Sequence, residues 1–143
     1  MTIHFICTGN IYRSRLAEAY CKSKSVSGLT VMSSGIQTTL NGGVPIARYA
    51  ADLLHAYGLE RFAAPFWQQT TPALVRASDV LVFMEREHYH FCKDWLDSTR
   101  QRFAIWNILD VGSAVSAADI MIKVEQTFAT IRRQTDSLLT KLA

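Results

Sequence analysis

TIHFICTGNIYRSRLAEAYCKSK, residues 2–24, contains a strand pattern, a loop and a helix pattern in direct succession. Thr2–Ile6 is rich in β-branched and aromatic residues and too short for a helix, so it predicts a strand. Apolar residues then recur at helical spacing over Arg13–Lys24, and Gly28 follows as a stop signal. The residues between the two patterns therefore form a loop that leads from a strand into a helix N-terminus.

Strand and helix patterns alternate along the rest of the chain. Further strands are expected at Leu29–Met32, Val80–Met84 and Phe103–Ile108. Alternation of this kind predicts an α/β fold with a parallel sheet, helices on both faces, and ligands at the carboxyl ends of the strands. The remaining helices are expected at Ala47–Tyr57, Pro72–Ala77, about Glu85–Lys93 and from the capping-box pair Ser116 and Asp119 onward, with loops at Ser33–Val44 and Leu109–Val115.

The composition predicts one folded domain over residues 1–143, in which 49% of residues are hydrophobic. A net charge of +3 is too small to indicate a nucleic-acid partner, while a small anionic ligand stays compatible. No apolar run reaches the roughly 18 residues of a membrane span, and the first residues lack a signal-peptide pattern. We therefore expect a cytoplasmic protein without a membrane partner, monomeric, whose three cysteines are reduced thiols.

The loop after the first strand has the features of a phosphate cradle. Unpaired backbone N–H groups and the helix dipole converge on an anion at such a position. Gly9 is expected to allow close approach of the backbone and a positive φ, and Asn10 also tolerates left-handed geometry. Arg13 closes the loop with a planar fork that can hold two oxygens of an oxyanion.

Cys7 lies in this positive field and is the expected nucleophile. A cysteine at a helix N-terminus beside an arginine is typically held as a reactive thiolate, and Ser14 is placed to donate a hydrogen bond to it. The alternative is that Cys7 fills the core and Arg13 lies on a helix surface. Gly, Asn, Arg and Ser together at these offsets have a chance frequency on the order of 10⁻⁵, which favours the functional interpretation.

At Cys7-Thr8-Gly9-Asn10-Ile11-Tyr12-Arg13-Ser14 the chain resembles the low-molecular-weight protein tyrosine phosphatase family, whose pattern is Cys-x-Gly-Asn-x-Cys-Arg-Ser-Pro followed by a helix with Ala-Glu. The likeness covers nearly the whole chain in order. It continues through Ser33-Ser34-Gly35, Tyr57-Gly58-Leu59, the segment from Ser78 to Glu85 with His88, and an Asp after the fourth strand.

The resemblance implies a four-stranded parallel sheet in a flavodoxin-like three-layer fold and a two-step hydrolysis of aryl phosphate monoesters, without metal or cofactor. It implies that Cys7 attacks phosphorus, that Asp110 is the general acid, and that Ser33 with Asn10 braces the loop. The substrate would be a phosphotyrosine protein or a small aryl phosphate, and inorganic phosphate the product. The oxygens would be bound by Arg13 and by the loop residues Thr8, Gly9, Asn10, Ile11, Tyr12 and Ser14.

Four positions depart from the family pattern. Tyr12 replaces a second cysteine that can protect the nucleophile, so that protection is expected to be absent. Arg15 replaces a proline and either attracts an anionic substrate or is a solvated side chain. Val111-Gly112 follows Asp110 in place of Pro and an aromatic pair. The segment 64–67 (APFW) either lines the pocket mouth or forms an apolar cluster under a loop, which we favour.

The other candidate residues have simpler explanations. His88 and Cys92 are four residues apart, but a surface histidine and a packed cysteine are favoured over a metal site. His4 is expected to be a buried structural histidine, and Arg132-Arg133 a solvated helix face. An arsenate reductase would need two further cysteines after the third strand, where only Cys92 is found. A phosphate- or phosphotyrosine-binding module with weakened catalysis remains the alternative without full enzyme activity.

Overall fold

The computed structural model describes residues 1–112 and 116–143. Strands and helices alternate along it, as expected, and three short 3₁₀ helices lie between them. The elements are β1 (Thr2–Cys7), α1 (Arg13–Ser23), β2 (Thr30–Gly35), η1 (Thr38–Asn41), α2 (Arg48–Ala56), η2 (Glu60–Phe62), α3 (Pro72–Arg76), β3 (Val80–Phe83), α4 (Arg86–Cys92), η3 (Lys93–Trp95), β4 (Arg102–Ile105) and α5 (Ala117–Leu142).

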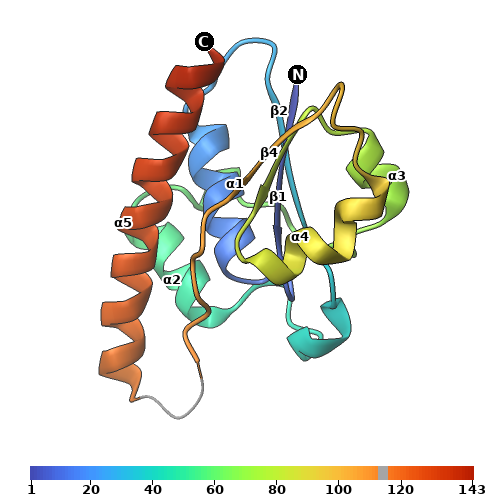
Figure 1. Ribbon diagram of the computed structural model, residues 1–143. Helices are drawn as coiled ribbons and strands as arrows, with labels where there is room; N and C mark the ends of the chain where they lie inside the picture. Colours follow the sequence, from blue (N-terminus) through green and yellow to red (C-terminus); the bar gives the residue numbers. More distant parts are fainter. Residues whose placement is uncertain (113–115) are drawn as a thin grey trace.

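The four strands form one parallel sheet in the order β2-β1-β3-β4. Helices α1, α2 and α5 lie on one face, and α3 and α4 lie on the other (Figure 1). The predicted α/β class with helices on both faces is confirmed. The strand order changes direction between β1 and β3, so the loop after β1 lies where parallel sheets of this type bind ligands.

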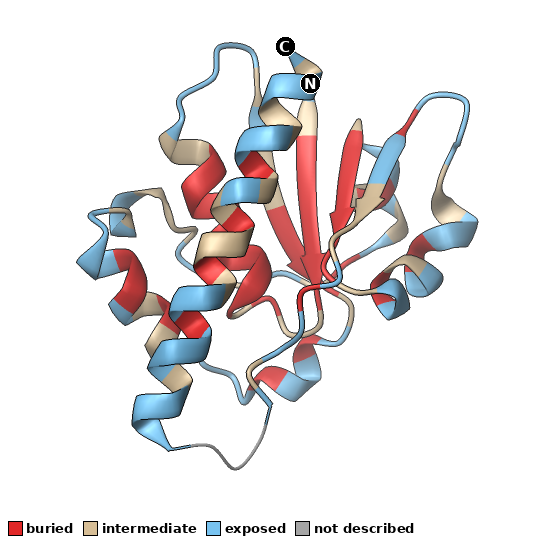
Figure 2. Cartoon of the chain, turned by 60° about the vertical axis from the view of Figure 1, so that its left-hand side comes forward, coloured by how far each residue is buried: buried red, intermediate tan, exposed pale blue. Residues whose placement is uncertain are grey.

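Alternating side chains of the central strands fill the two sides of the sheet. Ile3 and Phe5 of β1 pack under α1 and α5, while Ile6 packs toward α3 and α4 with Leu81 and Phe83 of β3. Figure 2 shows that the central strands β1 and β3 are buried almost throughout, whereas β4 at the edge of the sheet is partly exposed. Helix α1 is buried over most of its length, and α5 only at a few positions. The burial of the central strands is the pattern of a parallel sheet that is covered on both faces.

Two strand boundaries differ from the prediction by more than one residue. β2 runs three residues further than Met32, because Ser33, Ser34 and Gly35 pair in register with Phe5–Cys7 of β1. Two serines and a glycine lack the hydrophobic side chains by which a strand is predicted. Pairing with a central buried strand nevertheless satisfies their backbone groups. β4 ends at Ile105, and Asn107, two residues further on, has a φ of 55°, which lies outside strand geometry.

Of the two predicted loops, the first contains a short helix, and the second lies only partly within the described residues. Within the segment 33–44, Thr38–Asn41 forms η1 beside the loop that follows β1. The predicted loop Leu109–Val115 is described only to residue 112, and residues 113–115 lie outside the described residues. At the start of α5, the Oγ of Ser116 accepts the N–H of Asp119 at 3.2 Å, which is the capping contact expected there.

No helix within residues 1–112 and 116–143 is both long enough and apolar enough to cross a membrane.

Candidate active site

The loop that joins β1 to α1 lies against the end of β2. A Cβ atom added to Gly35 would approach the carbonyl oxygen of Thr8 to 2.5 Å and the nitrogen of Asn10 to 2.8 Å. These atoms are backbone and cannot move aside cheaply, so only glycine fits behind the loop. The end of β2 therefore supports the loop from outside the pocket.

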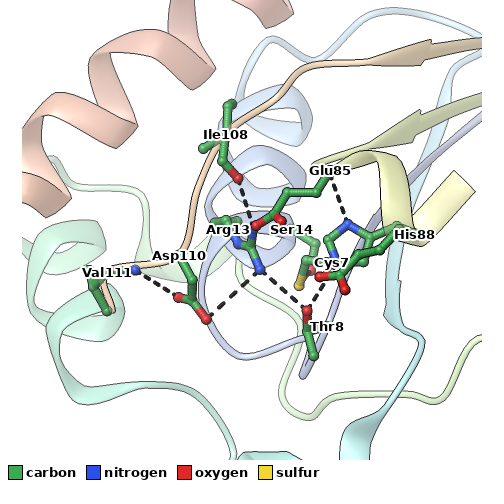
Figure 3. Close-up of polar contacts among 10 residues, drawn as sticks. Cys7, Thr8, Arg13, Ser14, Glu85, His88, Ile108, Asp110 and Val111 are labelled. Carbon is green, nitrogen blue, oxygen red and sulfur yellow. Dashed lines mark hydrogen bonds and ion pairs between the residues drawn. The ribbon is translucent and has the colours of Figure 1, made fainter. Parts of the chain in front are cut away.

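The Sγ of Cys7 lies 2.8 Å from the Oγ of Ser14, which is in the first turn of α1 (Figure 3). The Nδ2 of Asn10 donates to the same Ser14 Oγ at 2.8 Å and takes one of its lone pairs, so the hydroxyl hydrogen of Ser14 is available to the sulfur. Ser14 is thus placed to donate to Cys7.

Asn10 is the residue that gives the loop its shape. It has a φ of 57°, and its side chain donates to Ser33 Oγ at 2.9 Å and accepts the N–H of Gln68 at 2.9 Å. The brace between Asn10 and Ser33 that the resemblance implies is therefore present. Behind it, the Oγ of Ser33 donates to the buried carboxylate of Glu18 at 2.6 Å.

The expectation of a positive φ at Gly9 is wrong. The only residue of this loop with positive φ is Asn10, within the described part of the chain. Gly9 instead allows close packing, because a Cβ added there would lie 3.3 Å from the Cβ of Asn41 in η1. The amide of Asn41 in turn donates to the carbonyl of Gly9 at 3.2 Å. In this loop the left-handed backbone conformation is adopted by Asn10 and not by Gly9.

Arg13 is only 2% exposed and is held firmly at one end. Its NH1 donates to the carboxylate of Glu85 and, at 2.7 Å, to the carbonyl oxygen of Ile108 (Figure 3). Its NH2 has longer contacts, 3.4 Å to Thr8 Oγ1 and 3.8 Å to Asp110 Oδ2. One nitrogen is thus occupied by the protein, and the other is placed to bind the oxygens of a ligand.

Glu85 and His88 belong to this site, although the sequence did not identify them as site residues. They form a reciprocal capping box at the start of α4: the His88 N–H donates to the Glu85 side chain, and the Glu85 N–H donates to His88 Nδ1 at 2.9 Å. The expectation that His88 is a surface histidine is wrong, because its side chain is fully buried. The available signal was position, since both residues follow β3, whose carboxyl end lies beside that of β1.

Asp110 reaches the same pocket from the chain after β4. Its Oδ1 accepts the N–H of Val111 at 2.9 Å, and its side chain is 57% exposed. The pocket has a volume of about 420 Å³. The structure thus brings all three predicted catalytic residues to one cavity, which is lined by Cys7, Thr8, Gly9, Ile11, Tyr12, Arg13, Leu40, Asn41, Tyr49 and Asp110.

Two tyrosines form part of the pocket wall. The rings of Tyr12 and Tyr49 meet edge to face, with centroids 5.0 Å apart and an interplanar angle of 81°. Burial raises the pKa of Tyr12 to about 12, so its phenol stays neutral. Tyr12, which stands where the family pattern has a second cysteine, therefore contributes an uncharged aromatic surface.

Arg15 is buried and does not belong to the pocket lining, so the expectation of a solvated side chain is wrong, while the attraction of an anionic substrate stays a prediction. It is 1% exposed and donates to three carbonyl oxygens, those of Asn10 at 3.2 Å, Pro45 at 2.8 Å and Ala64. It ties the loop of Asn10 to two segments that lie far from it in the sequence. The cluster after Ala64 lies outside the pocket, and its Phe66 is 51% exposed beside the ring of Trp67.

The other candidate residues lie away from the pocket. Burial raises the pKa of Cys21 and of Cys92 to about 12, and Cys92 packs among apolar side chains under α4. His4 is a buried structural histidine, as expected, with Ser78 Oγ at 3.0 Å and Ser34 Oγ at 2.6 Å. The described residues contain no cluster of three or more His, Cys, Asp or Glu that could hold a metal ion.

The expectation of a solvated face at Arg132-Arg133 is correct only for the second residue. Arg133 is exposed. Arg132 instead stacks over two rings of the helical layer, with its guanidinium carbon 4.7 Å from the centroid of Phe128 and 5.0 Å from that of Tyr57.

Comparisons with known proteins agree with this fold. Three solved structures share the fold at identities that indicate the fold alone. The Drosophila arginine phosphatase DARP is 18% identical with a TM-score of 0.83, covering 99% of this chain and 98% of that one. SP-PTP, a low molecular weight protein tyrosine phosphatase from Streptococcus pyogenes, is 20% identical with a TM-score of 0.75, covering 99% and 93%. Wzb of Vibrio vulnificus, in complex with benzylphosphonate, is 20% identical with a TM-score of 0.73, covering 95% and 97%.

No curated protein matches the chain in sequence. The family model described as "Low molecular weight phosphotyrosine protein phosphatase" matches residues 2–143. Because this match extends over nearly the whole chain, the protein belongs to the low molecular weight phosphotyrosine protein phosphatase family.

Proposed function

We propose that the protein hydrolyses aryl phosphate monoesters, with phosphotyrosine in proteins as its substrate class, through a cysteinyl-phosphate intermediate. In the first step the Cys7 sulfur forms a bond to phosphorus while the bond from phosphorus to the aryl oxygen breaks, and Asp110 gives that oxygen a proton. In the second step Asp110 takes a proton from water, the water oxygen bonds to phosphorus, and the bond between sulfur and phosphorus breaks to release inorganic phosphate.

The observation that carries this proposal is the convergence of three groups on one pocket of about 420 Å³. The sulfur of Cys7 accepts a hydrogen bond from Ser14, which stabilises negative charge before attack and after departure. Arg13 offers NH2 toward the same space. Asp110 is exposed enough to meet both a leaving group and water.

The walls of the pocket support an aryl substrate. Ile11, Leu40, Tyr12 and Tyr49 present apolar and aromatic surface beside the phosphate loop, which suits a phenyl ring. A phosphoserine side chain is shorter and would not reach Cys7 from the pocket mouth. Phosphoarginine carries a charged guanidino group, and the pocket lining offers that charge a single carboxylate, Asp110. Most of the wall beside the phosphate loop is apolar or aromatic, which suits an aryl ring better than a charged group.

The first test is steady-state hydrolysis of p-nitrophenyl phosphate between about pH 5 and 8, without metal and with a chelator. Turnover is expected in the wild type and is expected to disappear in Cys7→Ser. Asp110→Asn is expected to lower kcat roughly 10²- to 10⁴-fold, since a positioned proton donor is removed. Asp94→Asn, which changes an exposed carboxylate in η3 directly after α4, is the matched control and should keep wild-type kcat.

The substrate class is tested by comparing peptides that carry phosphotyrosine, phosphoserine or phosphoarginine. The proposal predicts the highest kcat/KM for phosphotyrosine. Preference for phosphoarginine would overturn the aryl assignment while keeping a phosphatase. A wild type that binds phosphate or vanadate but turns over no substrate would instead identify a phosphate-binding module built on this loop.

A further inference from the structure

His88 makes polar contacts with two residues that themselves hold Arg13. On one side it is joined to Glu85 by the reciprocal capping box, and the Glu85 carboxylate accepts from Arg13 NH1. On the other side its Nε2 lies 3.0 Å from Thr8 Oγ1, and Thr8 Oγ1 lies 3.4 Å from Arg13 NH2. Figure 3 shows these residues as one connected set around the guanidinium.

The proton on the His88 ring can be placed from its partners. The Glu85 backbone N–H can only donate, so Nδ1, at 2.9 Å from it, is an acceptor without a proton. Burial and the positive charge of Arg13 lower the pKa of His88 to about 3, so the ring is neutral. A neutral ring with a bare Nδ1 carries its proton on Nε2, which therefore donates to Thr8 Oγ1.

This tautomer orients the Thr8 hydroxyl. With one lone pair of Oγ1 taken by His88, the other is available to Arg13 NH2. The ring also fixes the backbone from which the Glu85 carboxylate extends. A single buried imidazole thus sets one acceptor at each of the two terminal nitrogens of Arg13.

We propose that His88 is a positioning residue for catalysis, which holds the Arg13 guanidinium in its phosphate-binding orientation by fixing Glu85 through Nδ1 and Thr8 through Nε2. This inference rests on the proposed function, because it assigns a residue to the same reaction. His88 touches no substrate in this arrangement, since it acts only through Thr8 and Glu85.

The two contacts of His88, from Nδ1 to Glu85 and from Nε2 to Thr8, are its two arms, and they can be separated by substitution. In His88→Asn the amide oxygen can still accept the Glu85 N–H, but the donor to Thr8 is lost. In His88→Gln the amide nitrogen can still reach Thr8, but the acceptor for Glu85 is lost. His88→Phe removes both. The matched control is His90→Asn, which replaces an exposed histidine of the same helix and should leave activity unchanged.

Kinetics and phosphate binding are measured on each variant, with folding checked by melting temperature. We expect kcat/KM to fall about tenfold in His88→Asn and in His88→Gln, and about 100-fold in His88→Phe, because small displacements of a catalytic group are costly. The dissociation constant for inorganic phosphate, measured by calorimetry, should rise in the same order.

The decisive comparison uses Thr8→Val, which removes the Thr8 hydroxyl. Combined with His88→Asn, it should cause no loss beyond the larger of the two single effects, because both changes remove the same contact, the one between His88 and Thr8. Combined with His88→Gln, it should lower kcat/KM by the product of the single effects, because the two changes remove different arms.

The possible outcomes separate the inference from the proposed function. Wild-type turnover together with unchanged kcat/KM and phosphate binding in all three His88 variants would overturn the inference alone. Lower melting temperatures with unchanged phosphate binding would mean that His88 only stabilises the fold, which also overturns it. If the wild type does not turn over, the proposed function fails, and the phosphate dissociation constants still decide whether His88 positions Arg13.

Discussion

The three cysteines have very different surroundings, and this difference determines which of them can react. The Cys7 sulfur faces the pocket and lies 2.8 Å from the Oγ of Ser14, which is held in turn by Asn10. Burial raises the pKa of Cys21 and of Cys92 to about 12, which keeps both as thiols. Reactivity therefore depends on the position at the end of β1 and not on the residue type alone.

Alkylation of the folded protein should consequently be confined to one residue. We expect iodoacetamide at about pH 7 to modify Cys7 alone, since only the thiolate is a good nucleophile. Mass spectrometry of the digested protein measures the sites. Cys21→Ser should leave the labelling unchanged and Cys7→Ser should abolish it, whereas rapid modification of Cys92 would contradict the assignment.

Gly35 is a second position where one residue type is required. A Cβ there would lie 2.5 Å from the Thr8 carbonyl oxygen and would force the phosphate loop to move. We expect Gly35→Ala to lower kcat at least tenfold, because displaced loop N–H groups no longer match the phosphoryl oxygens. Gly28→Ala is the control: its φ of 76° makes alanine strained, costing about 1 kcal/mol, but no atom lies near its Cβ. Stability should fall there without loss of kcat, and a full kcat in Gly35→Ala would contradict the prediction.

Among the elements, α5 contributes to stability and not to the pocket. Phe128 on α5 is fully buried and makes edge-to-face contacts with Tyr20 of α1 at 6.0 Å and with Tyr57 after α2 at 4.9 Å. None of the residues that line the Cys7 pocket belongs to α5. The helix joins the elements of one layer and leaves the phosphate loop to β1, β2 and α1.

This separation predicts a variant that loses stability but keeps its chemistry. Phe128→Ala should lower the free energy of unfolding by about 3–5 kcal/mol, because it leaves a cavity and removes two aromatic contacts. Urea unfolding measures the loss, and kcat measured well below the melting temperature should be unchanged. Ile122→Ala, an exposed position of the same helix, should change stability by at most about 0.5 kcal/mol. A large effect on kcat in Phe128→Ala would show that α5 shapes the pocket.

For the molecule as a whole, two buried neutral histidines link stability to pH. His4 of β1 is joined to Ser34 and Ser78, and His88 is joined to Glu85 and Thr8. Burial lowers the pKa of His4 to about 4 and, with the charge of Arg13, that of His88 to about 3, from the ordinary value of 6.5. Below that ordinary value the unfolded chain binds protons that the folded protein does not.

The folded protein should therefore lose stability as the pH falls through this window. The stability that the neutral histidines provide is fully present above about pH 6.5 and is lost toward about pH 4 and 3. Each histidine should contribute a slope of up to about 1.4 kcal/mol per pH unit. Urea unfolding between about pH 5 and 7 measures this slope. It should become smaller by the share of one histidine in His4→Gln and stay unchanged in the exposed control His90→Gln, and a slope of zero in the wild type would contradict the prediction.

The layers of the fold and the phosphate loop could be predicted from the amino-acid sequence, because both depend on residues close together in the chain. Strand and helix periodicity predicted the parallel sheet, and the Cys7–Ser14 spacing identified the loop from one local segment. The predicted end of β2 was wrong because Ser33–Gly35 have low hydrophobicity. Their backbone pairing with β1 nevertheless extends the strand.

The way in which the loop and Arg13 are held could not be predicted, because it depends on contacts between residues far apart in the chain. Glu85 contacts Arg13 from 72 positions away, His88 contacts Thr8 from 80, and Gln68 contacts Asn10 from 58. These separations leave no periodic or local signal, since the contacts arise when parallel strands place their carboxyl ends at one edge of the sheet. Arg15 shows the same limit: its position predicts an exposed cation, yet three carbonyl oxygens from distant segments converge to bury it.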